Sequence, residues 1–300
     1  MQPDGSKPLT PWIGYLMLAG VVFGWSSGVV WVRGVHEVIP PLGMSFWRWF
    51  IGALMVLPFA RASLKKDGAL IRKHLVFYFM MGGLIVGGST LSTVSLNFTT
   101  ATNVGIVNAT QPMMTVLVAW AFFKDKLNAW QWAGIFVAFA GILAMVSKAD
   151  LAVFLDLSFN VGDFIMIGAV VMFAYYANNL PRLPSSVSFV SSLFVVMFAG
   201  SLLLIPLYAL ESIVLKPVPV STQAVVTVLF LALVPTVIPT IMWNRAVPAV
   251  GVSRSAIFVN LMPVFTAALA IGFLGESLFL YHVTGSLLVF AGIVLVVWRR

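Results

Sequence analysis

Two stretches of this sequence decide its fold, because one repeats the other. Residues 105–146 read GIVNATQPMMTVLVAWAFFKDKLNAWQWAGIFVAFAGILAMV, and residues 256–297 read AIFVNLMPVFTAALAIGFLGESLFLYHVTGSLLVFAGIVLVV. Without a gap, they share a proline, two glycines seven residues apart and an acidic position. Apolar composition alone does not produce this coincidence in one frame, so the chain contains an internal duplication. The aligned pairs are Ile106/Ile257, Pro112/Pro263, Thr115/Thr266, Ala119/Ala270, Phe122/Phe273, Asp125/Glu276, Leu127/Leu278, Gly134/Gly285, Phe139/Phe290, Ala140/Ala291, Gly141/Gly292, Ile142/Ile293 and Val146/Val297.

The composition indicates a membrane as the main solvent. Of the 300 residues, 61% are hydrophobic and 9% are charged, with a mean hydropathy of +1.04, whereas soluble domains carry about 25% charged residues. A spanning helix needs about 20 apolar residues, so ten spans leave no room for a soluble domain. A membrane β-barrel would show short alternating segments instead of these long apolar runs.

Apolar runs between charges and Pro/Gly breaks predict ten transmembrane helices. The first run ends at Arg33 without a small-residue cleavage pattern, so it is read as a span and not as a signal peptide. The predicted spans are 12–32, 41–60, 75–97, 102–123, 129–147, 161–180, 187–209, 222–244, 252–274 and 280–298.

The distribution of basic residues predicts the orientation. The net charge of +8 comes from short clusters between apolar runs, a pattern that the positive-inside rule explains better than nucleic-acid binding. With both termini in the cytoplasm, the outer side holds only Arg33, Lys148 and Lys216, and Arg48 lies inside a span. The remaining basic residues are then cytoplasmic: Lys7, Arg61, Lys65, Lys66, Arg72, Lys73, Lys124, Lys126, Arg182, Arg245, Arg254, Arg299 and Arg300.

Five spans in each repeat predict that the two halves are inverted relative to each other. After an odd number of crossings, the second repeat begins on the opposite side of the membrane from the first. The charges agree, since Lys124 and Lys126 of the inner side align with uncharged Gly275 and Ser277 of the outer side. Secondary transporters use such inverted repeats and hold substrate at the repeat interface. The predicted divisions are a cytoplasmic tail (1–11), a first five-helix repeat (12–148), an external linker (149–160) and a second repeat (161–300).

The duplicated pattern resembles the drug/metabolite transporter superfamily. In each copy, 101–148 and 252–299, a helix start rich in small residues leads to a proline, then an acidic residue followed two positions on by leucine, then two glycines. The Phe46, Trp47 and Arg48 stretch is similar to the second helix of the family. The closest resemblance is to EamA-type ten-helix members and, among them, to YddG-like exporters of aromatic amino acids. It implies that the fifth and tenth helices are peripheral; Asp125 stands where the family usually has Glu.

Polar residues near mid-span are the first candidate site residues. Asn108 and Gln111 precede Pro112 in the fourth span, and Asn260 precedes Pro263 in the ninth. Each proline removes a backbone hydrogen bond and kinks its helix beside these groups. Such residues face either a substrate cavity or another helix, so substrate-contacting gates and structural interhelical hydrogen bonds are both open interpretations.

Aromatic residues beside amides and hydroxyls are the second set. Such a surface suits an amphipathic substrate, because rings stack on its apolar part and polar groups bind the other end. Interfacial anchoring is the competing interpretation. The candidates are Trp25, Ser26 and Ser27 of the first span, Tyr175, Tyr176 and Asn178 of the sixth, and Trp243 of the eighth.

Glycines and one arginine complete the candidates. Gly20, Gly24 and Gly28 recur every four residues, a spacing that lets helices approach closely and that could also serve as a sliding contact during transport. Arg48 is the one basic residue well inside a predicted span. It either neutralises a substrate carboxylate or serves a structural role by reaching the interface or a helix carbonyl end.

These residues favour a transporter exporting small amphipathic metabolites, such as aromatic amino acids, across a bacterial inner membrane by alternating access. Expected partners are the small-molecule substrate and membrane lipid, without nucleic acid. The alternatives are an exchanger of anionic metabolites of nucleotide-sugar or triose-phosphate type, or a membrane enzyme or scaffold. The exchanger should hold several buried basic residues, and only Arg48 qualifies. With no Cys and three scattered His residues, the sequence indicates no cofactor, metal site or catalytic group.

Overall fold

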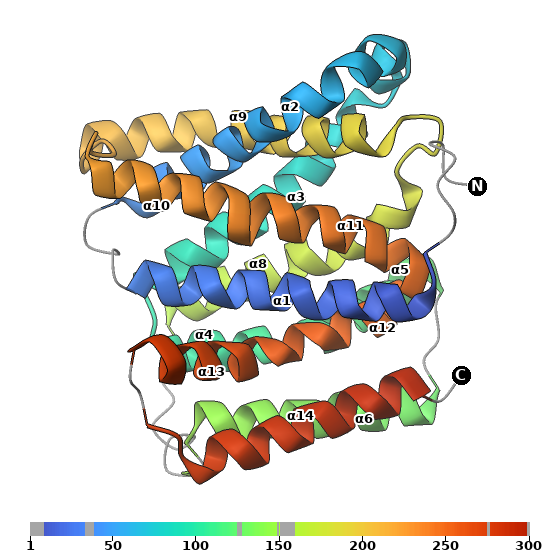
Figure 1. Ribbon diagram of the computed structural model, residues 1–300, viewed down its shortest axis with the longest axis vertical. Helices are drawn as coiled ribbons and strands as arrows, with labels where there is room; N and C mark the ends of the chain where they lie inside the picture. Colours follow the sequence, from blue (N-terminus) through green and yellow to red (C-terminus); the bar gives the residue numbers. More distant parts are fainter. Residues whose placement is uncertain are drawn as a thin grey trace.

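The computed structural model describes residues 9–33, 39–124, 128–148, 150, 160–274 and 277–298. Secondary structure in these residues is entirely helical. Ten segments are long and apolar enough to cross a membrane, which confirms the predicted all-α membrane fold. The first helix begins and the last helix ends on the same side of the molecule (Figure 1). We call this side the terminal face, and the other side the opposite face.

The described helices are grouped by the half of the sequence in which they lie. The first half contains α1 (Pro11–Arg33), α2 (Pro41–Lys73), α3 (Leu75–Ser95), α4 (Ala101–Ala109), α5 (Gln111–Phe123) and α6 (Ala129–Val146). The second half contains α8 (Val161–Asn179), η1 (Leu180–Arg182), α9 (Phe189–Val214), α10 (Thr222–Ala232), η2 (Leu233–Val237), α11 (Ile238–Val250), α12 (Val252–Ala256), η3 (Ile257–Leu261), α13 (Met262–Leu274) and α14 (Leu280–Trp298).

Three predicted spans end too early. The second was predicted to stop at residue 60, but α2 continues to Lys73, because the basic cluster stands among the good helix formers Ala and Leu. Five basic side chains of this extension are exposed, so charge marks where the helix leaves the apolar layer and not where it stops. Arg245 likewise does not end the eighth span, which continues to Val250. The seventh runs to Val214.

Helix packing follows the exchange of the two halves. The helix α1 packs on α11 and α13, and its counterpart α8 packs on α3 and α5. The pair α2 and α9 lies at one end of the bundle, and the pair α6 and α14 lies at the other (Figure 1). The pairs α2/α9 and α6/α14 each join a helix to its equivalent in the other repeat. The contacts of α1 with α11 and α13 have their equivalents in those of α8 with α3 and α5, as expected for two related repeats.

The two helices of the first pair cap each other. On the opposite face, the buried Glu211 near the end of α9 accepts hydrogen bonds from the backbone N–H groups of Leu42 (2.9 Å) and Gly43 (2.7 Å) at the start of α2. On the terminal face, the buried Asp67 near the end of α2 accepts one from the N–H of Ser188, the residue before α9 (3.0 Å). Carboxylates stabilise helix N-termini, so α2 and α9 are joined at both faces.

The pair at the other end is held by close backbone approach. A Cβ added to Gly134 of α6 would lie 2.6 Å from the carbonyl oxygen of Gly292, and one added to Gly141 would lie 2.6 Å from that of Gly285. These are the glycine pairs of the duplicated pattern. Their spacing therefore reports direct packing of α6 on α14, which leaves these two helices at the periphery of the bundle.

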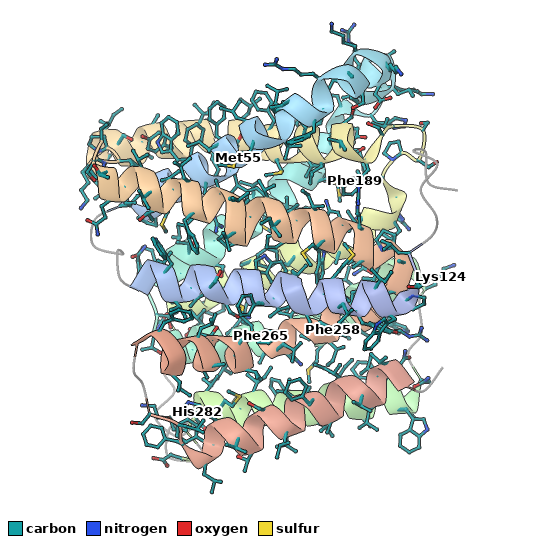
Figure 2. The ribbon with its side chains drawn as sticks, viewed as in Figure 1. Met55, Lys124, Phe189, Phe258, Phe265 and His282 are labelled. Carbon is teal, nitrogen blue, oxygen red and sulfur yellow. The ribbon has the colours of Figure 1, made fainter. Side chains whose placement is uncertain are left out.

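Side chains fill the space between the remaining six spans (Figure 2). Between α1 and the ninth span, Tyr15 stacks on Phe258 with ring centres 5.6 Å apart, and Phe23 meets the edge of Phe265 at 5.7 Å. A large apolar core continues from these contacts across both halves. The polar candidates are thus positioned by apolar packing around them.

Candidate functional site

The fourth span is interrupted at the predicted proline. The helix α4 ends at Ala109, and α5 begins at Gln111 with Pro112 as its second residue. Thr110 lies in the break, and its hydroxyl donates to the carbonyl of Val107 (2.6 Å). This hydroxyl stabilises the end of α4, so two helix ends meet within the membrane.

The ninth span is interrupted in the corresponding place. A tighter 3₁₀ segment, η3, separates α12 from α13, and Pro263 is the second residue of α13. Asn260 lies in η3 with 1% of its side chain exposed. Neither its amide nitrogen nor its amide oxygen has a hydrogen-bond partner in the described part of the chain. An unpaired buried amide is expensive, so the described residues leave the hydrogen-bonding capacity of this side chain unused.

The eighth span has an interruption that the sequence analysis missed. A wider π-helical turn, η2, joins α10 to α11, and the signal for it was the pair Pro235 and Pro239 within LVPTVIPT. The hydroxyl of Thr236 donates to the carbonyl five residues earlier, that of Leu231 (2.7 Å). Three spans therefore depart locally from regular α-helix, although each remains one helical segment long enough to cross the membrane.

The predicted glycines of α1 pack against this interruption. A Cβ added to Gly24 would lie 2.8 Å from Pro239, and one added to Gly28 would lie 2.8 Å from Pro235. One added to Gly20 would lie 2.6 Å from the terminal methyl carbon of Met242. The glycine face is thus the surface on which α1 meets η2 and α11.

Several predicted residues come together around α1. The rings of Trp25 and Trp243 lie 5.6 Å apart. The hydroxyl of Ser26 donates to the backbone carbonyl of Met262 (3.1 Å), and the amide nitrogen of Asn108 lies 3.9 Å from the sulfur of the same residue. The first span therefore meets the eighth at the tryptophan pair and meets the ninth at Ser26, while Met262 is also close to Asn108 of the fourth; we call these five side chains the α1 cluster.

The two adjacent tyrosines of α8 point in different directions. Tyr176 is buried, and its hydroxyl donates to the amide oxygen of Asn244 on α11 (2.8 Å). Tyr175 lies against Phe122, a residue 63% exposed on the outside of the bundle, with ring centres 5.3 Å apart. The structure therefore joins Tyr176, but not Tyr175, to the helices of the cluster; Asn244 was missed, because nothing in its sequence context identifies its partner.

Other candidates have structural partners. The amide of Asn178 donates to the backbone carbonyls of Thr115 (3.0 Å) and Ala174 (2.9 Å) and so ties α8 to α5. The hydroxyl of Ser27 donates to the carbonyl of Gly24 in its own helix (2.7 Å). Gln111 is buried at the start of α5.

Arg48 lies where α2 meets α3. Its guanidinium is hydrogen-bonded to the hydroxyl of Ser89, and its central carbon lies 5.8 Å from the ring centre of Trp49. The nitrogen Nε is buried without a partner in the described residues. Arg48 thus does not reach a helix carbonyl end through this nitrogen.

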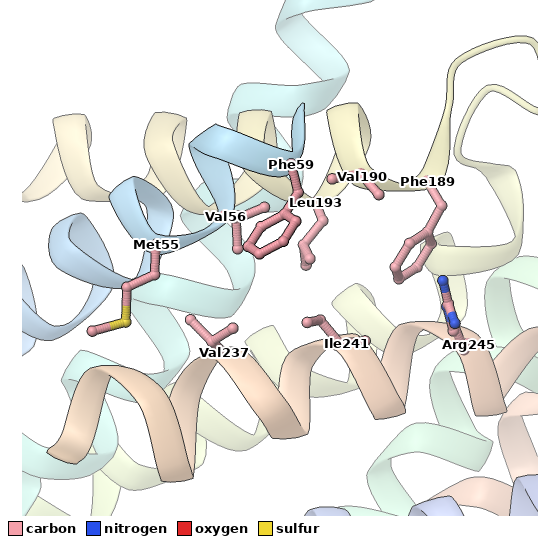
Figure 3. Close-up of a pocket in the computed structure, with 9 residues that line it drawn as sticks. All are labelled: Met55, Val56, Phe59, Phe189, Val190, Leu193, Val237, Ile241 and Arg245. Carbon is pink, nitrogen blue, oxygen red and sulfur yellow. The ribbon is translucent and has the colours of Figure 1, made fainter. Parts of the chain in front are cut away.

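A groove of about 290 Å³ lies apart from these residues, between α2, α9 and α11 (Figure 3). Eight of its nine lining side chains are apolar, and the ninth is Arg245, whose guanidinium lies 4.8 Å from the ring centre of Phe189. The lining includes none of the predicted substrate contacts. Among the described residues, no group of three His, Cys, Asp or Glu is placed to hold a metal ion.

The ten apolar spans define a multi-pass membrane protein. The sequence model of the EamA-like transporter family matches residues 12–147 and 160–298. This chain therefore belongs to the EamA-like transporter family, and it is a transporter and not an enzyme.

Related proteins cover nearly the whole chain. The uncharacterized transporter YyaM of Bacillus subtilis is 26% identical over 287 residues, which are 93% of this chain and 92% of that protein. An uncharacterized transporter of Archaeoglobus fulgidus is 26% identical over 283 residues, covering 94% and 96%. A crystal structure described only as that of a protein superposes with a TM-score of 0.76 at 17% identity, over 94% of this chain and 95% of the other. This last likeness shows the fold alone.

Proposed function

We propose that this transporter exports small amphipathic metabolites, aromatic amino acids among them, across the bacterial inner membrane by alternating access. The observation that carries the proposal is that three spans with local helix irregularities contribute aromatic and polar side chains to the contacts around α1. Broken helices expose backbone and side-chain polar groups inside the membrane only where they line a cavity or contact another helix.

The substrate class follows from the chemistry of that cluster. Trp25 and Trp243 offer faces on which an aromatic or aliphatic group can stack. Asn108, Gln111 and Asn260 offer uncharged donors and acceptors for a polar end. The unpaired amide of Asn260 supports a ligand contact most directly, because the described residues leave it unsatisfied.

The proposed orientation places the terminal face in the cytoplasm. It rests on thirteen of the 17 basic residues being assigned to that side, five of them between Arg61 and Lys73. The Tyr176–Asn244 hydrogen bond lies near the ends of α8 and α11 at the terminal face. In this orientation it joins the two helices on the cytoplasmic side. Export then requires this bond to open for substrate entry and to re-form afterwards.

Uptake of radiolabelled phenylalanine and tryptophan into proteoliposomes containing the purified protein tests the function. We expect protein-dependent flux for both and a reduced flux for Asn108→Ala. Protein-free liposomes are the control. Absence of protein-dependent flux for every amino acid tested would refute the substrate class.

A further inference from the structure

In the described residues, five buried side-chain atoms have no hydrogen-bond partner, and three of them lie on one helix, in the half of α2 nearest the opposite face. They are the Ser45 hydroxyl oxygen, Nε of Arg48 and Nε1 of Trp49. Ser45 is 1% exposed and Trp49 is 4% exposed. Each of these groups can donate a hydrogen bond, and the nitrogen atoms of Arg and Trp can only donate.

Helix geometry brings the three together. Residues three and four apart on a helix are neighbours on one face, so Ser45 is adjacent to both Arg48 and Trp49. The guanidinium of Arg48 lies near the Trp49 ring and is hydrogen-bonded to Ser89 on α3, which fixes its position between the two helices. The three donor-bearing side chains are thus neighbours on α2, with one positive charge among them.

The buried carboxylates in the described residues are occupied elsewhere. Glu211 caps α2, and Asp67 binds the backbone N–H of Ser188. Asp163 accepts hydrogen bonds from Thr99 (2.6 Å) and from the backbone N–H of Asn160 (2.9 Å). A charge within the membrane is costly unless it is paired with an opposite charge. None of these three carboxylates is paired with Arg48, so binding of an anion would stabilise its charge.

We propose that Ser45, Arg48 and Trp49 bind the carboxylate of the transported substrate. The inference rests on the proposed function and adds to it that the exported amphipathic metabolite is a monocarboxylate. A single cation with neutral donors matches the single charge of a carboxylate, and hydrogen bonds from a guanidinium to a carboxylate are among the strong ones. A phosphate carries up to two charges and would be only partly neutralised here.

Binding by the purified full-length protein in detergent tests this, with isothermal titration calorimetry as readout. The probes are phenylalanine, phenylalaninamide and 3-phenylpropionate. In phenylalaninamide an uncharged amide replaces the carboxylate, whereas 3-phenylpropionate keeps the carboxylate but lacks the amine. The variants are Arg48→Gln and Trp49→Phe. The matched control is Trp47→Phe, because the Trp47 indole N–H already donates to the Tyr208 hydroxyl (3.1 Å).

Wild-type protein should prefer phenylalanine over phenylalaninamide, and both variants should lose about tenfold or more of that preference, as expected for a hydrogen bond to a charged group. Trp47→Phe should keep it. The preference is a ratio, so a merely structural role, which weakens both ligands alike, does not move it. Trp49→Phe keeps the charge and the ring, which protects the test if Arg48→Gln fails to fold.

Three results separate the possible failures. A preference that survives in both variants, or is lost equally in Trp47→Phe, overturns the site. The site is also overturned if the wild-type protein binds neither phenylalanine nor 3-phenylpropionate. If 3-phenylpropionate binds in an Arg48-dependent manner while phenylalanine does not bind, the carboxylate site stands and the amino-acid assignment of the proposed function falls.

Discussion

Replacing Asn260 by leucine should stabilise this protein and impair it at the same time. Leucine has the same γ-branched shape as asparagine but is apolar. Because neither amide atom of Asn260 has a partner in the described residues, the substitution breaks no hydrogen bond there and removes an unsatisfied polar group. Such a group costs about 1–3 kcal/mol, so the free energy of unfolding should rise by about 1–2 kcal/mol.

The matched control is Asn244→Leu, which makes the same chemical change at another buried asparagine. Here the amide oxygen accepts the Tyr176 hydroxyl at 2.8 Å, and leucine leaves that hydroxyl without its acceptor. Hydrogen bonds between membrane helices contribute about 0.6 kcal/mol on average and at most about 1.7. The free energy of unfolding should therefore fall by about this amount, opposite in sign to the change at Asn260.

Thermal unfolding in detergent, followed by tryptophan fluorescence, measures both variants, and flux into proteoliposomes measures function. We expect a higher Tm with reduced flux for Asn260→Leu and a lower Tm for Asn244→Leu. If Asn260→Leu lowers the Tm as much as Asn244→Leu does, the Asn260 amide has a structural partner. The argument that it awaits a substrate is then wrong.

Three further outcomes are expected. A cysteine replacing Lys66 in this Cys-free chain should react with an impermeant thiol reagent in inverted vesicles, and its labelling in intact cells would reverse the proposed orientation. Glu211→Gln should lower the free energy of unfolding in denaturant by about 1–3 kcal/mol. Asp67→Asn should lower it by less, because Glu211 accepts two backbone N–H bonds and Asp67 accepts one. Equal losses in the two variants would contradict this reasoning. Gly24→Ala should lower the Tm, because its added Cβ would lie 2.8 Å from a proline ring carbon. Gly272→Ala is the control and should leave the Tm unchanged, because its added Cβ would have no neighbouring atom within 4 Å. Equal Tm values for the two variants would count against close packing at Gly24.

Hydrophobic length predicted the spans because each helix must cross the same apolar thickness. The predicted span 129–147 corresponds to Ala129–Val146, where charge and apolarity change together. The boundary at residue 60 was wrong, because hydropathy reports the edge of the membrane and not the end of a helix. The π-helical turn was missed because proline spacing shows that a helix is perturbed, but not which hydrogen-bond pattern replaces the regular one.

The candidate site was harder to predict, because periodicity does not say which neighbour a side chain meets. Tyr175 and Tyr176 look equivalent in the sequence, yet successive residues on a helix point about 100° apart, and only Tyr176 meets α11. Ser45 and Trp49 were not singled out, because each has an ordinary structural explanation alone. Only the absence of hydrogen-bond partners among the described residues, which needs coordinates, distinguishes them.

The mutual capping of α2 and α9 has a consequence for biosynthesis. The carboxylate that caps α2 lies 169 residues after Leu42, so at about 5–20 residues per second the ribosome needs roughly 10–30 s to supply it. During that interval the backbone N–H groups of Leu42 and Gly43 lack the carboxylate that caps them in the folded protein. The first repeat therefore completes its assembly only when the second has entered the bilayer. Separately expressed halves should accumulate only when both are produced in the same cell.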